Sequence, residues 1–168
     1  APFWTSEWPN TDFNNSAVAF IDILSGGPGK DGIPALNNPS YEPAESAAIT
    51  PQEPVMTVEL NGQARAYPIR YLMWHEIANT EVGGVPVAVT YCPLCNSGLV
   101  FDRRLDGQVL EFGVTGKLRY SDMIMFDRQT ESWWQQFTGE GIVGDMNGKK
   151  LVQVISWMEP MSAFVARN

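Results

Sequence analysis

Apolar residues in the later part of the chain occur in short runs that are typical of β-strands. Pairs of these runs flank three turn signals, Asn61-Gly62, Asp106-Gly107 and Asn147-Gly148. Asn-Gly and Asp-Gly accept the positive φ angles of two-residue type I′ turns, so each signal predicts an antiparallel hairpin. The hairpins are expected over residues 55–67, 99–112 and 142–155. An almost continuous apolar run at 85–91 predicts one more strand, central to the core.

Helical patterns are few and short. Residues 69–78 and 159–166 each begin beside a proline, which favours the first turn of a helix. Residues 16–24 are a further candidate, with Ser16 as the N-cap. The sequence therefore predicts a mainly β protein, at the margin of α+β, whose antiparallel or barrel-like core is built from hairpins with a few short helices.

The chain is expected to form a single domain over residues 1–168, because its length suits one hydrophobic core. Residues 1–54 are rich in Pro, Asn, Gly and Ser and are expected to be a loop-rich segment packed on a β-rich core at 55–168. Exposed aromatic rings are costly, so the aromatic side chains of this segment are expected to dock on that core. They are Trp4, Trp8, Phe13 and Phe20.

Charge and hydropathy exclude several partners. The formal net charge of −8 opposes binding to nucleic acid or to an anionic membrane. No apolar stretch reaches the ~20 residues of a membrane-spanning helix, so membrane insertion is not expected. The sequence starts at Ala1-Pro2 without a methionine, which is typical of an exported protein after removal of its signal peptide. A periplasmic or extracellular location is the resulting expectation.

Cys92 and Cys95 are the only cysteines and lie in a Cys-Pro-Leu-Cys turn. This spacing is compatible with a disulfide, a dithiol redox couple, or two thiolate ligands of one metal ion. An apolar strand precedes the turn and residues 99–101 continue as another strand. The turn is therefore expected to join two strands, unlike the strand-to-helix turn of thioredoxin-like proteins.

His75 is the only histidine, and Asn79 stands where a zinc-protease motif needs its second histidine. A three-histidine zinc site and a two-histidine copper site are also excluded. A Cys–His pair, a metal site with both cysteines, and a core histidine with a hydrogen-bond partner all remain open. Four carboxylates offer glycosidase chemistry, but no spacing distinguishes them: Asp102, Asp122, Asp127 and Glu131.

Several motifs together resemble the bacterial and archaeal family designated domain of unknown function 3179. The motifs are Ala-Arg-Ala-Tyr-Pro at 64–68, His-Glu-Ile at 75–77, Val-Ala-Val-Thr-Tyr-Cys-Pro-Leu-Cys-Asn-Ser at 87–97, Phe-Asp-Arg at 101–103, Gly-Val-Thr-Gly-Lys-Leu-Arg at 113–119 and Asp-Arg-Gln-Thr-Glu-Ser-Trp-Trp at 127–134. The resemblance implies an exported or lipoprotein-like location. Some relatives carry selenocysteine at a cysteine position, which favours redox chemistry. Other relatives keep only the first cysteine, which implies that Cys92 attacks and Cys95 resolves.

Three hypotheses follow. The leading one is an exported thiol oxidoreductase that needs no cofactor, in which Cys92 is the nucleophile, Cys95 resolves a disulfide and His75 tunes the sulfur. Its substrate would be a small-molecule or protein thiol or disulfide. The alternative is a module that binds Cu(I) or another soft metal through Cys92, Cys95 and His75. The third is a non-catalytic scaffold with a structural disulfide.

Overall fold

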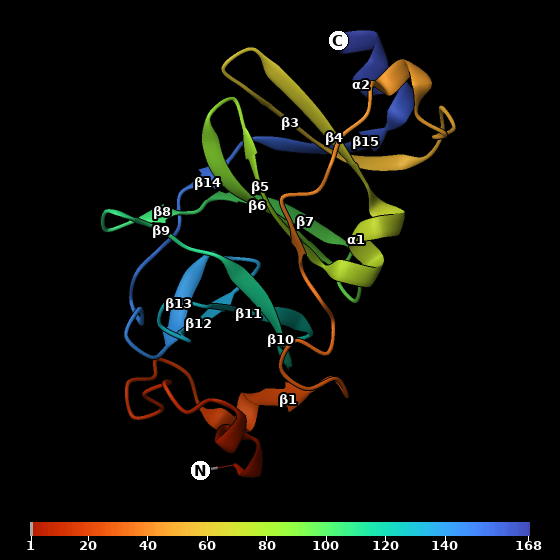
Figure 1. The fold of residues 1–168 in the computed structure, drawn as a ribbon. Coiled ribbons are helices and arrows are strands. Elements are labelled where there is room, and N and C mark those ends of the chain that lie inside the picture. The colour runs from red at the N-terminus through yellow and green to blue at the C-terminus, as the bar shows by residue number, and fades with distance from the viewer. Residues whose placement is uncertain (1) are drawn as a thin grey trace.

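The protein is seen in a computed structural model that describes residues 2–168. Its strands form three main sheets, which we call the lower, middle and upper sheets after their positions in Figure 1. The early part of the N-terminal segment lies below the lower sheet, and the C-terminus lies beside the upper sheet. The prediction of a mainly β fold built on antiparallel pairs is confirmed.

The lower sheet is entirely antiparallel. In spatial order its strands are β1 (Ile23–Ser25), β10 (Phe112–Arg119), β11 (Asp122–Asp127), β12 (Trp133–Gln135) and β13 (Glu140–Val143). The pairing of β10 with β11 shifts register between Val114 and Leu118. Gly116 lies inside this irregularity at φ +76°, and a Cβ there would stand 2.1 Å from the carbonyl oxygen of Pro28. Glycine is therefore required where the N-terminal segment crosses the sheet.

The N-terminal segment docks on the lower sheet through its aromatic side chains, as predicted. Trp4, Trp8, Phe13 and Phe20 belong to one hydrophobic cluster or pack against it. Trp4 stacks on Trp133 with ring centroids 5.2 Å apart, and Trp8 meets Phe126 edge-on at 4.8 Å. The segment begins with the 3₁₀ helix η1 (Phe3–Glu7) and reaches β1 through η2 (Phe20–Asp22).

The middle sheet contains the predicted central strand. In spatial order its strands are β14 (Gln153–Val154), β7 (Ser97–Asp102), β6 (Val85–Cys92), β5 (Ile77–Val82) and β2 (Leu36–Asn37). Residues on the two faces of β6 pack into two different hydrophobic clusters. Val87 and Val89 belong to one cluster, and Ala88 and Cys92 belong to the other. Burial of both faces explains why this strand is almost continuously apolar.

The upper sheet contains β15 (Ser156–Pro160), β3 (Pro54–Leu60) and β4 (Gln63–Pro68), in that order. Asn61 and Gly62 join β3 to β4 with φ angles of +50° and +80°, so the first predicted hairpin is confirmed. Helix α1 (Ile69–His75) follows β4, and helix α2 (Met161–Arg167) follows β15. The 3₁₀ helix η3 (Ala44–Ser46) packs near the upper sheet, so the N-terminal segment passes all three sheets.

The second predicted hairpin forms a separate short ribbon. Asp106 and Gly107 join β8 (Arg104–Leu105) to β9 (Gln108–Val109) with φ angles of +50° and +81°. The flanking strands β7 and β10 enter different sheets, because each finds longer partners there. None of the helices in residues 2–168 is long and apolar enough to cross a membrane.

The hairpin predicted at Asn147-Gly148 forms its turn, but its strands differ from the prediction. The amide of Lys149 donates to the carbonyl oxygen of Met146 at 3.0 Å, so Asn147 and Gly148 occupy the turn, and Lys150 forms an isolated antiparallel bridge with Glu140 of β13. Strand β14 then pairs with β7, on another sheet. The local turn preference is therefore met, but pairing at the open edge of the middle sheet takes residues 153–154 away from β13.

The helix predicted at 16–24 is wrong. Ser16 pairs with Val143 in an isolated bridge, and its hydroxyl accepts a bond from the amide of Val18 at 3.2 Å. The rest of the stretch divides between η2 and β1, which pairs with β10. Contacts with the lower sheet replace the intrahelical hydrogen bonds that the local pattern predicted.

Candidate functional site

The cysteine turn joins two paired strands, as predicted. Strand β6 ends at Cys92, and Cys92 is paired with Ser97 at the start of β7. Asn96 adopts a φ of +46°, and its side-chain oxygen accepts a hydrogen bond from the hydroxyl of Tyr91 at 2.8 Å. This bond ties the end of the turn to the strand that precedes it.

The two cysteines are free thiols in different environments. Cys92 is 1% exposed and belongs to the cluster between the middle and lower sheets, whereas Cys95 is exposed. Cys95 lines a cavity of about 250 Å³. The cavity is completed by Arg119, Tyr120, Asp122, Gln135, Phe137 and Thr138. One sulfur is thus reachable from solvent and the other lies behind it.

Asp122 is brought to the cysteines by the turn between β10 and β11. Tyr120 and Ser121 form this turn at φ +53° and +64°, so that Asp122 pairs with Arg119 and opens β11. Asp122 Oδ1 lies 3.7 Å from Cys95 Sγ. The ligand atoms of Cys92, Cys95 and Asp122 all lie within 4.8 Å of one another.

The second oxygen of Asp122 is fixed by two donors. Asp122 Oδ2 accepts hydrogen bonds from Gln135 Nε2 at 2.7 Å and from the backbone amide of Phe137 at 2.8 Å. Cys92 Sγ, in turn, lies 3.7 Å from the carbonyl oxygen of Ser121. The carboxylate is therefore held with Oδ1 directed at the sulfur of Cys95.

The surroundings of Cys95 disfavour its thiolate. Partial burial of the sulfur, the neighbouring Cys92 and the carboxylate of Asp122 raise the pKa of the Cys95 thiol to about 12. Burial and the two nearby thiols also raise the pKa of Tyr91. Four groups that can carry negative charge, those of Tyr91, Cys92, Cys95 and Asp122, thus meet in one place, and they repel one another when ionised.

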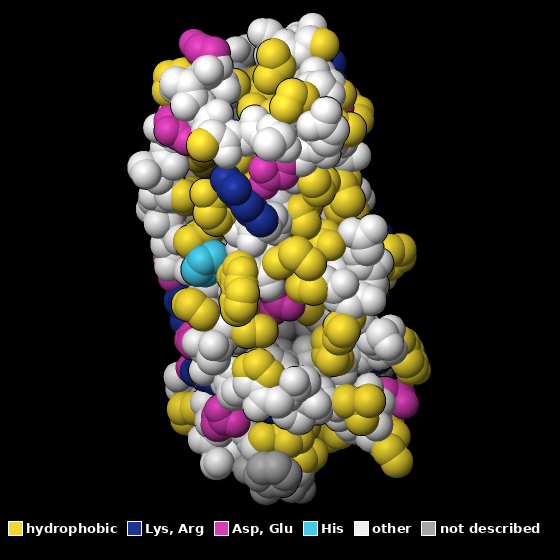
Figure 2. Space-filling model, turned by 90° about the vertical axis from the view of Figure 1, so that its right-hand side faces the viewer, with side chains coloured by type: hydrophobic (Ala, Val, Ile, Leu, Met, Phe, Trp, Pro, Cys, Tyr) yellow, Lys and Arg dark blue, Asp and Glu magenta, His cyan; other side chains and the backbone are white. Residues whose placement is uncertain are grey.

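His75 does not belong to this three-residue cluster. It ends α1, and its Nδ1 lies 2.7 Å from the carbonyl oxygen of Pro34. Figure 2 shows the histidine at the surface beside hydrophobic side chains. Its predicted action on the cysteines remains a prediction that no contact in residues 2–168 supports.

No sequence pattern places Asp122 beside the cysteines. It is one of four carboxylates that no spacing distinguishes, and it lies far along the chain from the cysteine turn. The closest available signal is the family motif at 113–119, which ends just before it. Only the packing of the lower sheet against the middle sheet shows the juxtaposition.

Comparison with known proteins gives one match. The family model described as "Protein of unknown function (DUF3179)" matches residues 30–168. Neither the curated proteins nor the solved structures contain a match.

Proposed function

Because the chain belongs to the DUF3179 family, whose function is unknown, we propose a function from the site itself: Cys92, Cys95 and Asp122 bind one soft or borderline metal ion. The observation that carries the proposal is the convergence of two sulfurs and one carboxylate oxygen within 4.8 Å. Two thiolates and a carboxylate suit Zn²⁺, and the thiolates alone suit Cu(I).

The spacing of the donors fits tetrahedral coordination. A ligand sulfur at ~2.3 Å and a ligand oxygen at ~2.1 Å from one tetrahedral ion stand about 3.6 Å apart. Cys95 Sγ and Asp122 Oδ1 are 3.7 Å apart. The bonds from Gln135 and Phe137 to Asp122 Oδ2 supply the outer support that metal-ligating carboxylates need.

Charge supports the same function. The carboxylate of Asp122 opposes ionisation of Cys95, whereas a bound cation would reverse that effect. Metal binding should then release thiol protons and strengthen as the pH rises. The side facing the cavity would leave a coordination position open to a small ligand.

Anaerobic titration of the reduced protein with Co²⁺ or Zn²⁺ tests the proposal. We expect one ion per chain and, for Co²⁺, thiolate-to-metal charge-transfer absorption. Asp122→Asn should weaken binding by at least ~10-fold. Glu140→Gln, an exposed carboxylate change on the same sheet, should not. Lack of stoichiometric binding, or equal affinity in Asp122→Asn and the parent protein, would overturn the assignment.

A second candidate function is dithiol oxidation, favoured by the exposure of Cys95 beside Cys92. Cys95 would attack a disulfide RSSR, form a mixed disulfide and release RS⁻, which takes up the thiol proton. Cys92 would then attack Cys95 Sγ, close the Cys92–Cys95 disulfide and release a second RSH. Two electrons pass to the substrate. Access rather than acidity selects Cys95 as the attacking thiol here, since Cys92 is buried; the raised pKa of Cys95 would slow the attack. This order is the reverse of the one implied by the family resemblance.

Trapping with glutathione disulfide tests this candidate. Cys92→Ser should accumulate a mixed disulfide on Cys95, and Cys95→Ser should react far more slowly, both measured by mass spectrometry. Faster reaction of Cys95→Ser would restore the order in which Cys92 attacks. Absence of any adduct in either variant would exclude the reaction.

A further inference from the structure

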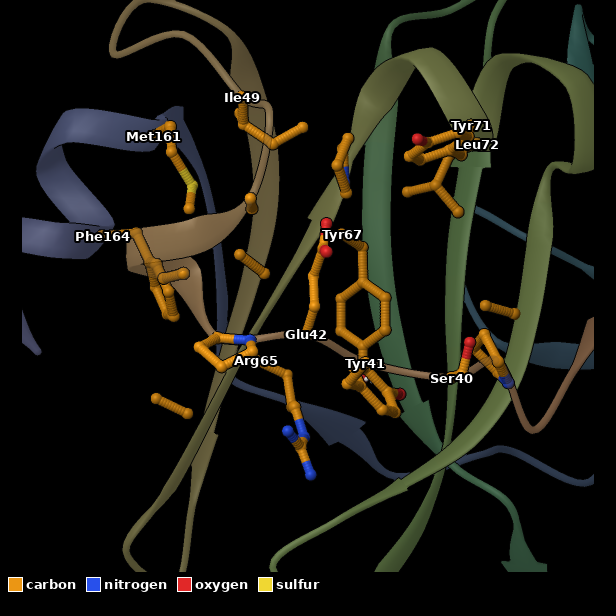
Figure 3. Close-up of a pocket in the computed structure, with 18 of the residues that line it drawn as sticks. Ser40, Tyr41, Glu42, Ile49, Arg65, Tyr67, Tyr71, Leu72, Met161 and Phe164 are labelled. Carbon is orange, nitrogen blue, oxygen red and sulfur yellow. Dashed lines mark hydrogen bonds between the residues drawn. The ribbon is translucent and has the colours of Figure 1, made fainter.

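A second, larger cavity lies away from the cysteines, between the N-terminal segment and the upper sheet. Its volume is about 860 Å³, within the range of small-molecule sites. The N-terminal segment around η3 forms one wall, β4 forms the floor, and α1 and α2 close the ends (Figures 1 and 3). The floor is low because Ala64 and Ala66 present only methyl groups.

The walls of this cavity are mostly apolar and aromatic. Figure 3 shows Phe164 and Met161 on one side of the cavity, and Tyr67 and Tyr71 on the other. The hydroxyl of Tyr67 is already paired, 3.0 Å from that of Tyr41, so Tyr67 offers the cavity mainly its ring. Such walls suit a ligand with an apolar body.

One acidic side chain, that of the solvent-exposed Glu42, lines this largely apolar cavity. Figure 3 shows Glu42 extending between Phe164 and Tyr67. Within residues 2–168, the Glu42 carboxylate has no hydrogen-bond or ion-pair partner. A ligand cation placed there would meet a carboxylate and the faces of aromatic rings together, which is the usual combination in sites for organic ammonium groups.

Arg65, the basic residue among those that line the cavity, is already engaged. The guanidinium of Arg65 stacks on the ring of Tyr41, with Cζ 4.1 Å from the centroid. In Figure 3 the Arg65 side chain extends away from the end of Glu42. The side of the cavity between Phe164 and Tyr67 therefore has a negative, aromatic character.

We propose that this cavity binds a small apolar organic cation, with its ammonium group beside Glu42 and its apolar body against Phe164, Tyr67 and the alanine floor. The site is separate from Cys92, Cys95 and Asp122, because the residues that line the two cavities do not overlap.

Octyltrimethylammonium, octanesulfonate and 1-octanol, used below micelle-forming concentrations, are matched probes. Isothermal titration calorimetry of the intact protein should show saturable 1:1 binding that is strongest for the ammonium. Glu42→Gln should weaken ammonium binding by about 5- to 10-fold and leave octanol binding unchanged, as expected for a cation that loses a charged partner. Glu45→Gln, on the same segment but outside the cavity, should change neither.

A steric variant tests the location. Ala47→Leu adds bulk from the N-terminal segment, at a position that lines the cavity, without altering the sheet. It should weaken binding of the ammonium and of octanol alike. Equal affinity for ammonium and sulfonate, no effect of Glu42→Gln, or unchanged binding in Ala47→Leu would each overturn the proposal.

Discussion

Glu76 makes the stability of this protein depend on pH in an unusual direction. It follows α1 directly, at φ +60°, and is only 9% exposed. Its carboxylate has no hydrogen-bond or ion-pair partner within the described residues. Burial raises the pKa of Glu76 from 4.5 to about 7.

The sign follows from proton binding. Between pH 4.5 and 7 the folded protein keeps a proton on Glu76 that the unfolded chain releases, so stability falls as the pH rises. The stabilisation that comes from protonated Glu76 is complete below the pKa of the unfolded chain and is lost as the pH passes the pKa of the folded protein. At ~1.4 kcal/mol per pKa unit, the difference between these two pKa values corresponds to at most about 3 kcal/mol of folding free energy. Partial contact of the carboxyl with water reduces this value.

Urea unfolding at pH 4.5 and pH 8, followed by tryptophan fluorescence, measures the effect. Glu76→Gln removes the titrating group, so the stability difference between variant and parent should shift by up to ~3 kcal/mol in favour of the variant at pH 8. Glu45→Gln, on an exposed 3₁₀ turn, should follow the parent at both pH values. Parallel pH curves for Glu76→Gln and the parent would refute the reasoning.

Other changes probe the site and the lower sheet. Asp122→Asn should lower the pKa of Cys95 and speed its alkylation by iodoacetamide at pH 8 several-fold, because a negative neighbour is removed; an unchanged rate would contradict this. Gly116→Ala should destabilise the fold by ~2 kcal/mol or more in thermal melts, since the new Cβ would meet the carbonyl oxygen of Pro28; a neutral change would show that the segment is free to move. Trp133→Ala should cost ~3–5 kcal/mol in urea unfolding, because it empties the cluster that holds the N-terminal segment.

Local turn chemistry predicted the fold well where the two strands were each other's best partners. Asn61-Gly62 closes a hairpin whose strands are consecutive in one sheet. At Asn147-Gly148 the same signal predicted the turn but not the full strand pairing, since residues 153–154 pair with β7 instead. The local sequence determines the turn preference. Which strand edge a segment pairs with depends on the whole fold.

The candidate site was predictable only in its local part. The Cys92 to Cys95 turn and its flanking strands follow from residues that are adjacent in sequence. Asp122 reaches the turn through the pairing of β10 with β11 and the packing of one sheet on another, which no spacing in the sequence encodes. His75 is the opposite case. The chemistry of its side chain predicts a role at the cysteines, but its position beside Pro34 does not support that role.

The way the N-terminal segment is anchored has a consequence for biosynthesis. Trp4, Trp8, Phe13 and Phe20 are translated before residues 124–143, which supply the other half of their cluster. Until the ribosome has produced that later part, these aromatic side chains have native contacts only within their own segment, such as Trp4 with Phe13 at 5.9 Å, and their remaining apolar surface is free to associate with other chains.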